Sequence, residues 1–179
     1  MPWIKVLPAL TKKQFQILLL VLWLSLVFVA AVYFISKRIA AFDPNLTLLN
    51  TQHASIMAQV KKIPGLEATN LSDTIVHFTQ QGCHCTRFSD QHKQQINRSA
   101  NEDNFNVLNI ELSADSIIPS TPAILIVDKL GQLMYLGPYS KGLECTKTNG
   151  FVELVLNNYQ QGFNSKLVVS QAQGCYCNS

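Results

Sequence analysis

The chain has 179 residues, of which 14 are Lys or Arg and 11 are Asp or Glu, and this length argues for one domain with at most an appendage. The formal net charge of +3 lies in the N-terminal arm at Lys5, Lys12 and Lys13, because the other basic residues are balanced by the acidic ones. A nucleic-acid-binding domain needs a net basic face, so we expect no nucleic-acid partner.

A long apolar segment follows the arm. The residues from Ile17 to Ile35 carry no charge, and as a helix they would extend roughly 28 Å, close to the ~30 Å hydrocarbon thickness of a bilayer. A cleaved signal peptide usually has a shorter apolar core of about 7–15 residues. We therefore expect an uncleaved signal anchor over residues 14–36, in contact with membrane lipid from Ile17 to Ile35.

The charges that flank this segment predict its orientation. Lys5, Lys12, Lys13 and the terminal amine precede it, whereas only Lys37 and Arg38 follow it closely. The positive-inside rule then places the N-terminal arm in the cytoplasm. We expect a single-pass protein of a bacterial inner membrane whose C-terminal domain is periplasmic. All five cysteines follow the segment, in agreement with a compartment where disulfides persist.

The exported part alternates helix and strand patterns. Apolar residues from Leu48 to Ile63 recur at helical spacing, and the polar stretch 86–99 is also typical of a helix. Apolar or β-branched runs predict strands at 74–79, 105–112, 123–127 and 132–136, the last two joined as a hairpin, before a helix at 151–159. The pattern predicts an α/β domain with one sheet covered by helices on both faces. We divide the chain into a cytoplasmic arm (1–13), the anchor (14–36), a linker and helix (37–65), the domain (66–163) and a cysteine-containing tail (164–179).

The chemistry is expected at a Cys-x-Cys motif. Cys83 and Cys85 follow a predicted strand and precede a predicted helix, so Cys83 should lie near a helix N-terminus. Unpaired backbone N–H groups and the helix dipole favour a thiolate there, and His84, if protonated, and Arg87 would add positive potential. A thiolate is the form that attacks disulfides or binds soft metals.

The pattern resembles the thioredoxin-like superfamily, most closely its membrane-anchored periplasmic redox members. The resemblance covers roughly Leu66 to Gly162 and rests on three places: the strand Ile75–Phe78 that leads to Cys83, the segment Thr121-Pro122-Ala123, and the run AILIVDKLGQLMYLG after it. It implies a thioredoxin-like central mixed sheet flanked by helices. It also implies that Pro122 is cis and lies beside Cys83 and Cys85, and that the backbone of Thr121 can pair with an extended substrate segment.

The chain departs from this family at the site. Only His84 separates the two cysteines where the family has two residues, and Gly82 replaces a common aromatic residue. His77 stands where many members have a buried acid, and it either acts as a base or simply packs. A Cys83–Cys85 disulfide would have to lie in a turn ahead of the helix, because helical residues two apart do not face each other. Such a bond is expected to be strained and therefore oxidising.

Three cysteines remain, Cys145, Cys175 and Cys177, and the last two repeat the Cys-x-Cys spacing. An odd total leaves at least one thiol free, paired between molecules or bound to something. One assignment is a structural disulfide from Cys145 to Cys175 or Cys177, whose loop of about 30 residues would contribute roughly 3–4 kcal/mol. Another lets the leftover tail cysteine resolve or reload the Cys83–Cys85 pair.

The expected function is thiol–disulfide exchange, as an oxidoreductase or isomerase acting on protein thiols or disulfides of the envelope. Cys83 would attack, Cys85 would resolve, and Thr121 with Pro122 would dock the substrate, without an organic cofactor. One alternative is a copper(I) chaperone that binds through Cys83, Cys85 and His84, or a thiolate-rich copper or zinc site that includes the tail cysteines. A third is a redox-inert structural or interaction domain. His53 and His92 are expected to be solvated polar residues on helices.

Overall fold

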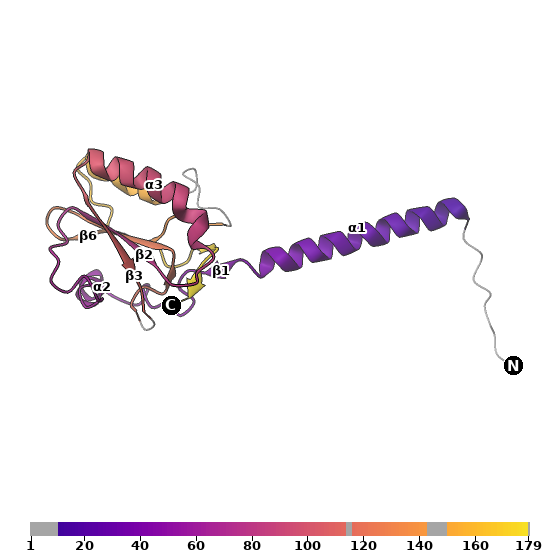
Figure 1. Ribbon diagram of the computed structural model, residues 1–179, viewed down its shortest axis with the longest axis horizontal. Helices are drawn as coiled ribbons and strands as arrows, with labels where there is room; N and C mark the ends of the chain where they lie inside the picture. Colours follow the sequence, from indigo (N-terminus) through magenta and orange to yellow (C-terminus); the bar gives the residue numbers. More distant parts are fainter. Residues whose placement is uncertain (1–10, 114–115, 143–149, 179) are drawn as a thin grey trace. The chain divides into compact units, whose positions relative to one another are not determined.

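The computed structural model describes residues 11–113, 116–142 and 150–178 (Figure 1). Lys5 and most of the N-terminal arm lie outside the described residues, and so does Cys145. The chain divides between Lys37 and Arg38 into two compact units.

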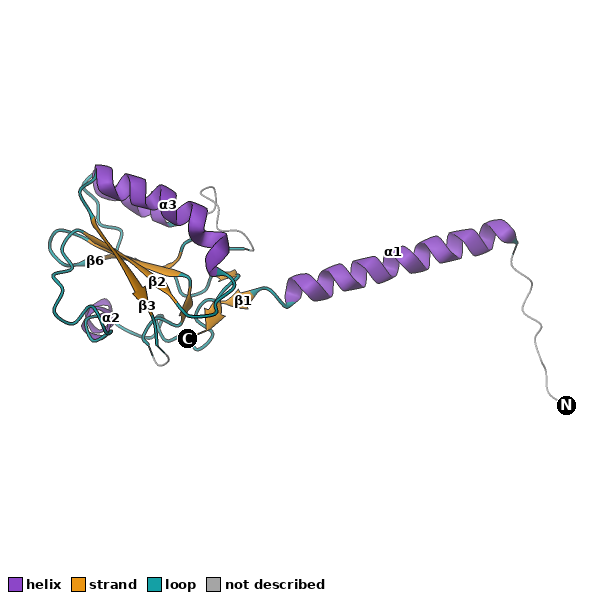
Figure 2. Ribbon diagram, in the orientation of Figure 1, coloured by secondary structure: helices purple, strands orange, loops and turns teal. Residues whose placement is uncertain are grey.

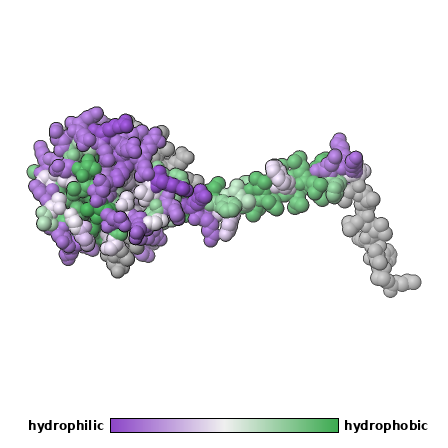
Figure 3. All heavy atoms as spheres, viewed as in Figure 1, coloured by the Kyte–Doolittle hydropathy of each residue, from purple (hydrophilic) through white to green (hydrophobic). Residues whose placement is uncertain are grey.

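The first unit is a single helix, α1, over Lys12–Ser36. A capping box begins it: the Gln14 N–H donates to the Thr11 hydroxyl, and the Thr11 N–H donates to the Gln14 side-chain oxygen. None of its side chains is buried, and Figure 3 shows apolar residues along most of its length. At 25 residues, or roughly 37 Å, this helix is long and apolar enough to cross a membrane.

The second unit is built on a mixed five-stranded sheet with the strand order β3-β2-β5-β6-β7. The pairs β2–β3 and β6–β7 are parallel, whereas β2–β5 and β5–β6 are antiparallel. These findings confirm the expected α/β class and the mixed sheet. The sheet strands are β2 (Thr74–Thr79), β3 (Asn106–Glu111), β5 (Ala123–Val127), β6 (Leu133–Pro138) and β7 (Leu167–Val168).

Helices cover both faces of this sheet (Figures 1 and 2). α2 (His53–Val60) packs on one face, whereas α3 (Thr86–Glu102) and α4 (Val152–Gln160) pack on the other. Because successive strand side chains point to opposite faces, each central strand contributes to both apolar cores. Val76 and Leu125 lie in the core under α2, while Ile75 and Ile124 lie in the core under α3 and α4.

The predicted hairpin between the two central strands is confirmed. β5 and β6 are joined by a tight turn in which Asp128 Oδ1 accepts hydrogen bonds from the N–H groups of Leu130 (2.9 Å) and Gln132 (2.8 Å). Gly131 in this turn has a φ of +73°, a conformation that only glycine adopts at little cost.

The segment before the sheet contains less helix than its apolar spacing predicted. α2 begins only at His53, because the buried carboxylate of Asp43 accepts hydrogen bonds from the N–H groups of Thr47 (2.8 Å) and Leu48 (2.7 Å) and holds the chain in a turn. Leu48 is nevertheless buried in the core beneath α2. This segment therefore belongs to the packed unit that carries the sheet.

Four further strands of two residues each occur in pairs. β1 (Ala40–Ala41) pairs antiparallel with β8 (Gln173–Gly174), and β4 (Ser120–Thr121) pairs antiparallel with β9 (Cys177–Asn178). Residues 164–178, expected as a tail, thus supply β7 to the central sheet and β8 and β9 to these small sheets. The last of these pairings brings the end of the chain to the Thr121-Pro122 segment.

Candidate functional site

The first Cys-x-Cys motif lies in the turn between β2 and α3. The Cys83 N–H donates to the Gln80 carbonyl at 3.2 Å, and Gly82 between them has a φ of +76°. Cys85 is the N-cap residue of α3, so the prediction that Cys83 lies near a helix N-terminus is confirmed. Cys83 is half-buried, Cys85 is buried and His84 is exposed.

The Thr121-Pro122 segment faces Cys83 from the neighbouring part of the sheet. The peptide bond between Thr121 and Pro122 is cis, as the sequence predicted. Cys83 Sγ lies 3.6 Å from the carbonyl oxygen of Thr121. Thr121 itself is fully buried at the end of β4, directly before the buried central strand β5. The structure therefore brings together a helix-terminal sulfur and the backbone edge of β4.

Both cysteines of this motif are joined to the second Cys-x-Cys motif. Cys83 forms a disulfide with Cys177, with 5.8 Å between their Cα atoms, and Cys85 forms one with Cys175, with 5.5 Å between theirs. These bonds connect residues 94 and 90 positions apart in the chain. Two matching motifs thus meet face to face in a pair of adjacent disulfides.

These pairings correct two predictions. The expected Cys83–Cys85 disulfide is wrong, because each cysteine is bonded to the final segment instead. The expected bond from Cys145 to Cys175 or Cys177 is wrong for the same reason. Cys145 itself lies outside the described residues.

The repeated spacing explains why the two motifs fit each other. Residues two apart in an extended segment point to the same side, so Cys175 and Cys177 can both face the α3 terminus. Tyr176 between them packs elsewhere: its ring contacts Phe42, with 5.3 Å between centroids, and its hydroxyl donates to the Ser140 carbonyl at 2.7 Å. The recurrence of Cys-x-Cys at both places was the sequence signal for this pairing.

A thiolate cluster is the arrangement that a soft metal would need. The Sγ atoms of Cys83, Cys85 and Cys177 all lie within 4.8 Å of one another. His84 is exposed and does not belong to this group of potential ligands in the part of the chain that the structure describes. The cysteines would have to be reduced before they could bind Cu(I) or Zn(II), because the thiolate is the ligand form.

His77 lies fully buried in the middle of β2. Its Nε2–H donates to Asn97 Oδ1 at 2.7 Å, and its Nδ1 accepts from the Tyr139 hydroxyl at 2.5 Å. Burial lowers the pKa of His77 to about 4, the Asn97 hydrogen bond opposes this shift, and nearby Lys93 adds to it. A neutral imidazole with both nitrogens engaged favours the packing alternative for His77 over the role of a base.

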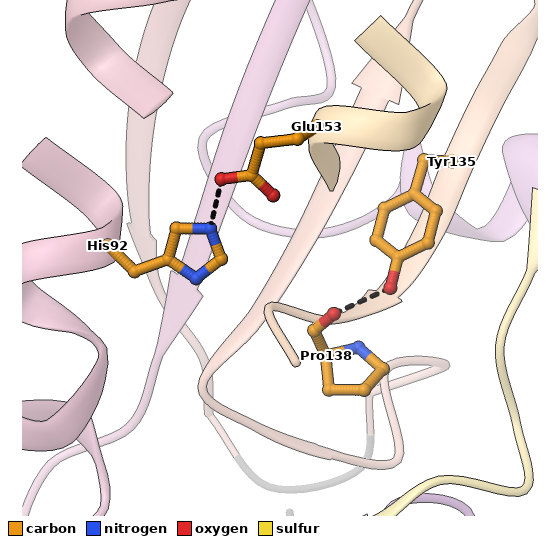
Figure 4. Close-up of polar contacts among 4 residues, drawn as sticks. All are labelled: His92, Tyr135, Pro138 and Glu153. Atoms are coloured by element: carbon orange, nitrogen blue, oxygen red, sulfur yellow. Dashed lines mark hydrogen bonds and ion pairs between the residues drawn. The ribbon is translucent and has the colours of Figure 1, made fainter. Parts of the chain in front are cut away.

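The prediction that His92 is solvated is wrong. Its side chain is 1% exposed, and its Nε2–H donates to Glu153 Oε1 of α4 at 2.5 Å (Figure 4). His53, in contrast, is exposed as expected. The helical spacing of the buried side chains of α3 contained the signal that was missed: they are Ser89, His92, Ile96 and Ala100.

Tyrosines connect these buried histidines to β6 and the loop after it. The Tyr139 ring stacks on His77, with 5.7 Å between centroids, and lies 5.9 Å from the His92 ring. The Tyr135 hydroxyl donates to the Pro138 carbonyl at 2.5 Å (Figure 4). Burial raises the pKa of Tyr135 well above its ordinary value, so this phenol stays a neutral donor.

Comparison with protein families gives one match, to a domain of unknown function (DUF6436), over residues 51–179. The match covers most of the chain. The chain belongs to this family. Its matched region contains both Cys-x-Cys motifs, Thr121 and Pro122. Neither the curated proteins nor the solved structures contain a match.

Proposed function

We propose that this DUF6436 protein is a membrane-anchored thiol–disulfide exchange protein with a thioredoxin-like domain. One observation carries the proposal: Cys83 Sγ lies 3.6 Å from the carbonyl oxygen of Thr121, the residue before a cis proline. A sulfur at the start of a helix faces there the backbone of a short strand. The order of β2, α3 and β3, followed by the β5–β6 hairpin, also supports the thioredoxin-like assignment.

Cys83 is the attacking residue in this proposal. Its thiolate attacks one sulfur of a substrate disulfide, a mixed disulfide forms, and the other substrate sulfur leaves as a thiolate. A second protein thiolate then attacks the Cys83 sulfur and releases the remaining substrate sulfur. Two electrons pass from the protein dithiol to the substrate, and an external dithiol restores the reduced protein by the reverse exchange. The free N–H groups at the α3 terminus stabilise the Cys83 thiolate.

The anchor and the disulfides support an oxidising compartment for this chemistry. α1 is long and apolar enough to cross a membrane, and more positive charge precedes it than follows it. With the N-terminal arm in the cytoplasm, the domain would face the periplasm of a bacterium, where disulfides form and persist. Its substrates would be thiols or disulfides of envelope proteins.

Replacing Cys83 tests the exchange function. The reduced full-length protein in detergent is mixed with oxidised glutathione, quenched with a maleimide and mapped by mass spectrometry. We expect the wild-type protein to acquire glutathione on Cys83 and the Cys83→Ser variant to lose exchange at this site. Cys145→Ser, which changes neither described disulfide, is the matched control and should keep the wild-type rate. Exchange at an undiminished rate in Cys83→Ser would contradict the proposal and favour a redox-inert domain.

The sulfur cluster supports a second candidate function, the binding of a soft metal ion. Cys83, Cys85 and Cys177 would supply three thiolates, a ligand set that suits Cu(I) or Zn(II). We expect the reduced protein to bind about one Cu(I) per chain if this function is correct, and Cys85→Ser to weaken binding strongly. Titration in the presence of a competing Cu(I) chelator measures both quantities. Equal affinity for the reduced wild-type protein and the variant would exclude this site.

A further inference from the structure

The strand that pairs with β4 belongs to the chain itself. In the β4–β9 pair, Thr121 lies opposite Cys177 and Ser120 lies opposite Asn178. The Ser120 hydroxyl lies 3.0 Å from Asn178 Oδ1. Cys177 is thus held both by its disulfide to Cys83 and by the backbone edge that the proposed function assigns to the substrate.

The segment that carries Cys177 is also held upstream, without help from the sulfurs. The Cys175 N–H donates to the Gly142 carbonyl at 3.1 Å, and the Gly142 N–H donates to the Gln173 carbonyl at 2.8 Å. Gly174 is needed at this contact, because a Cβ there would lie 2.6 Å from the Gly142 oxygen. Buried Tyr176 adds its contacts with the core. Residues Gln173–Asn178, which we call the arm, therefore dock by backbone and ring contacts as well as by disulfides.

The two disulfides differ in their surroundings. Cys85 is only 8% exposed at the N-cap of α3, whereas Cys83 and Cys177 are both half-buried. A buried sulfur is harder for an external thiolate to reach, and access controls the rate of exchange. We expect an incoming thiol to open Cys83–Cys177 before Cys85–Cys175.

We propose that Cys177, and not Cys85, is the resolving cysteine for Cys83. The second disulfide, Cys85–Cys175, is then the tether that keeps the arm in place while Cys83 is bonded to a substrate. This inference rests on the proposed exchange function. It assigns a catalytic residue that lies 94 positions from the attacking cysteine.

The cycle balances with one dithiol and one disulfide. The Cys83 thiolate attacks the substrate disulfide, and the last residues of the arm leave β4 while Tyr176 and β8 stay docked. The Cys177 thiolate then attacks Cys83 Sγ, forms Cys83–Cys177 and releases the second substrate thiolate. Two electrons have moved to the substrate, whose thiolates take protons from water. An external dithiol reopens Cys83–Cys177 and is itself oxidised to a disulfide.

The lifetime of the mixed disulfide on Cys83 tests this assignment. In full-length Cys177→Ser protein, mildly reduced and treated with oxidised glutathione, we expect the Cys83–glutathione adduct to persist at least about tenfold longer than in the wild-type protein, because an intramolecular thiol acts at millimolar effective concentration. The matched variant Cys85→Ser,Cys175→Ser lacks the tether but retains Cys177, so it should still resolve the adduct. A long-lived adduct in the matched variant and rapid resolution in Cys177→Ser would overturn the inference.

A second pair of variants retains every cysteine. Tyr176→Ala removes the ring and hydroxyl that dock the arm, and we expect slower resolution of the Cys83 adduct once both disulfides have been reduced. Tyr176→Phe keeps the ring against Phe42 and should be closer to the wild-type protein. Equal lifetimes in Tyr176→Ala and the wild-type protein would count against a docked arm. A merely structural disulfide would change the urea midpoint but not the adduct lifetime.

The same experiments separate this inference from the function on which it rests. If free Cys83 acquires no glutathione in any of these proteins, the exchange function itself is wrong. If Cys83 acquires glutathione but Cys85 resolves it, the exchange function stands and only the assignment of Cys177 is wrong.

Discussion

Removal of both disulfides is expected to lower the free energy of unfolding by about 7 kcal/mol in the chain-entropy model, far more than twice the effect of removing either one. The bonds close loops of 94 and 90 residues, but one loop lies inside the other. The first bond therefore removes most of the freedom of the unfolded chain, about 5 kcal/mol, and the second closes only a ring of a few residues, about 2 kcal/mol. The four-serine variant should thus be much less stable than either two-serine variant.

Urea unfolding of the full-length protein in detergent, followed by tyrosine and tryptophan fluorescence, measures these differences. The two-serine variants are Cys83→Ser,Cys177→Ser and Cys85→Ser,Cys175→Ser, and we expect each to lose about 2 kcal/mol. Additive losses, with each pair costing half of the total, would contradict the nested pairing and point to disulfides that close separate loops. Cys145→Ser serves as the control for a cysteine outside both bonds.

Acidification is expected to destabilise the domain through His77 by about 3 kcal/mol between neutral pH and pH 4. Burial lowers the pKa of His77 to about 4 in the folded protein, whereas an unfolded chain has the ordinary value near 6.5. Between these values the unfolded state binds more protons, so the free energy of unfolding rises with pH. The contribution is complete above about pH 6.5 and is lost as the pH falls towards 4.

Urea unfolding at several pH values from 4 to 7 measures this slope. His77→Gln removes the titrating group and should flatten the curve, although the loss of the hydrogen bonds to Asn97 and Tyr139 will also lower its stability at neutral pH. His53→Gln replaces an exposed histidine and should retain the wild-type slope. An unchanged slope in His77→Gln would assign the acid sensitivity to other groups.

Local periodicity and turn chemistry were sufficient for most of the secondary structure. The charge-free run before Ser36 predicted α1, and the β-branched run from Thr74 to Thr79 matches β2. The Asp128–Gly131 turn predicted the β5–β6 hairpin. These signals are local because a strand repeats every two residues, a helix about every 3.6, and a tight turn needs particular side chains.

The short strands escaped prediction because two residues contain no period. β4 and β9 are recognisable only from their pairing, and Ala40–Ala41 of β1 has no pattern of its own. The role of His92 escaped for a related reason. The polar helix α3 has one buried face, and only the position of α4 decides that Glu153 meets His92 there.

By itself, the sequence determined the membrane-length helix, the α/β order of elements, and a reactive cysteine placed between a strand and a helix ahead of a Thr-Pro segment. These features follow from hydropathy and from spacing over a few residues. Only the tertiary structure decided that Cys83 bonds to Cys177 and that Cys85 bonds to Cys175. A cysteine can bond to any other that the fold brings within about 6 Å between Cα atoms, and sequence spacing says nothing about meetings across some 90 residues.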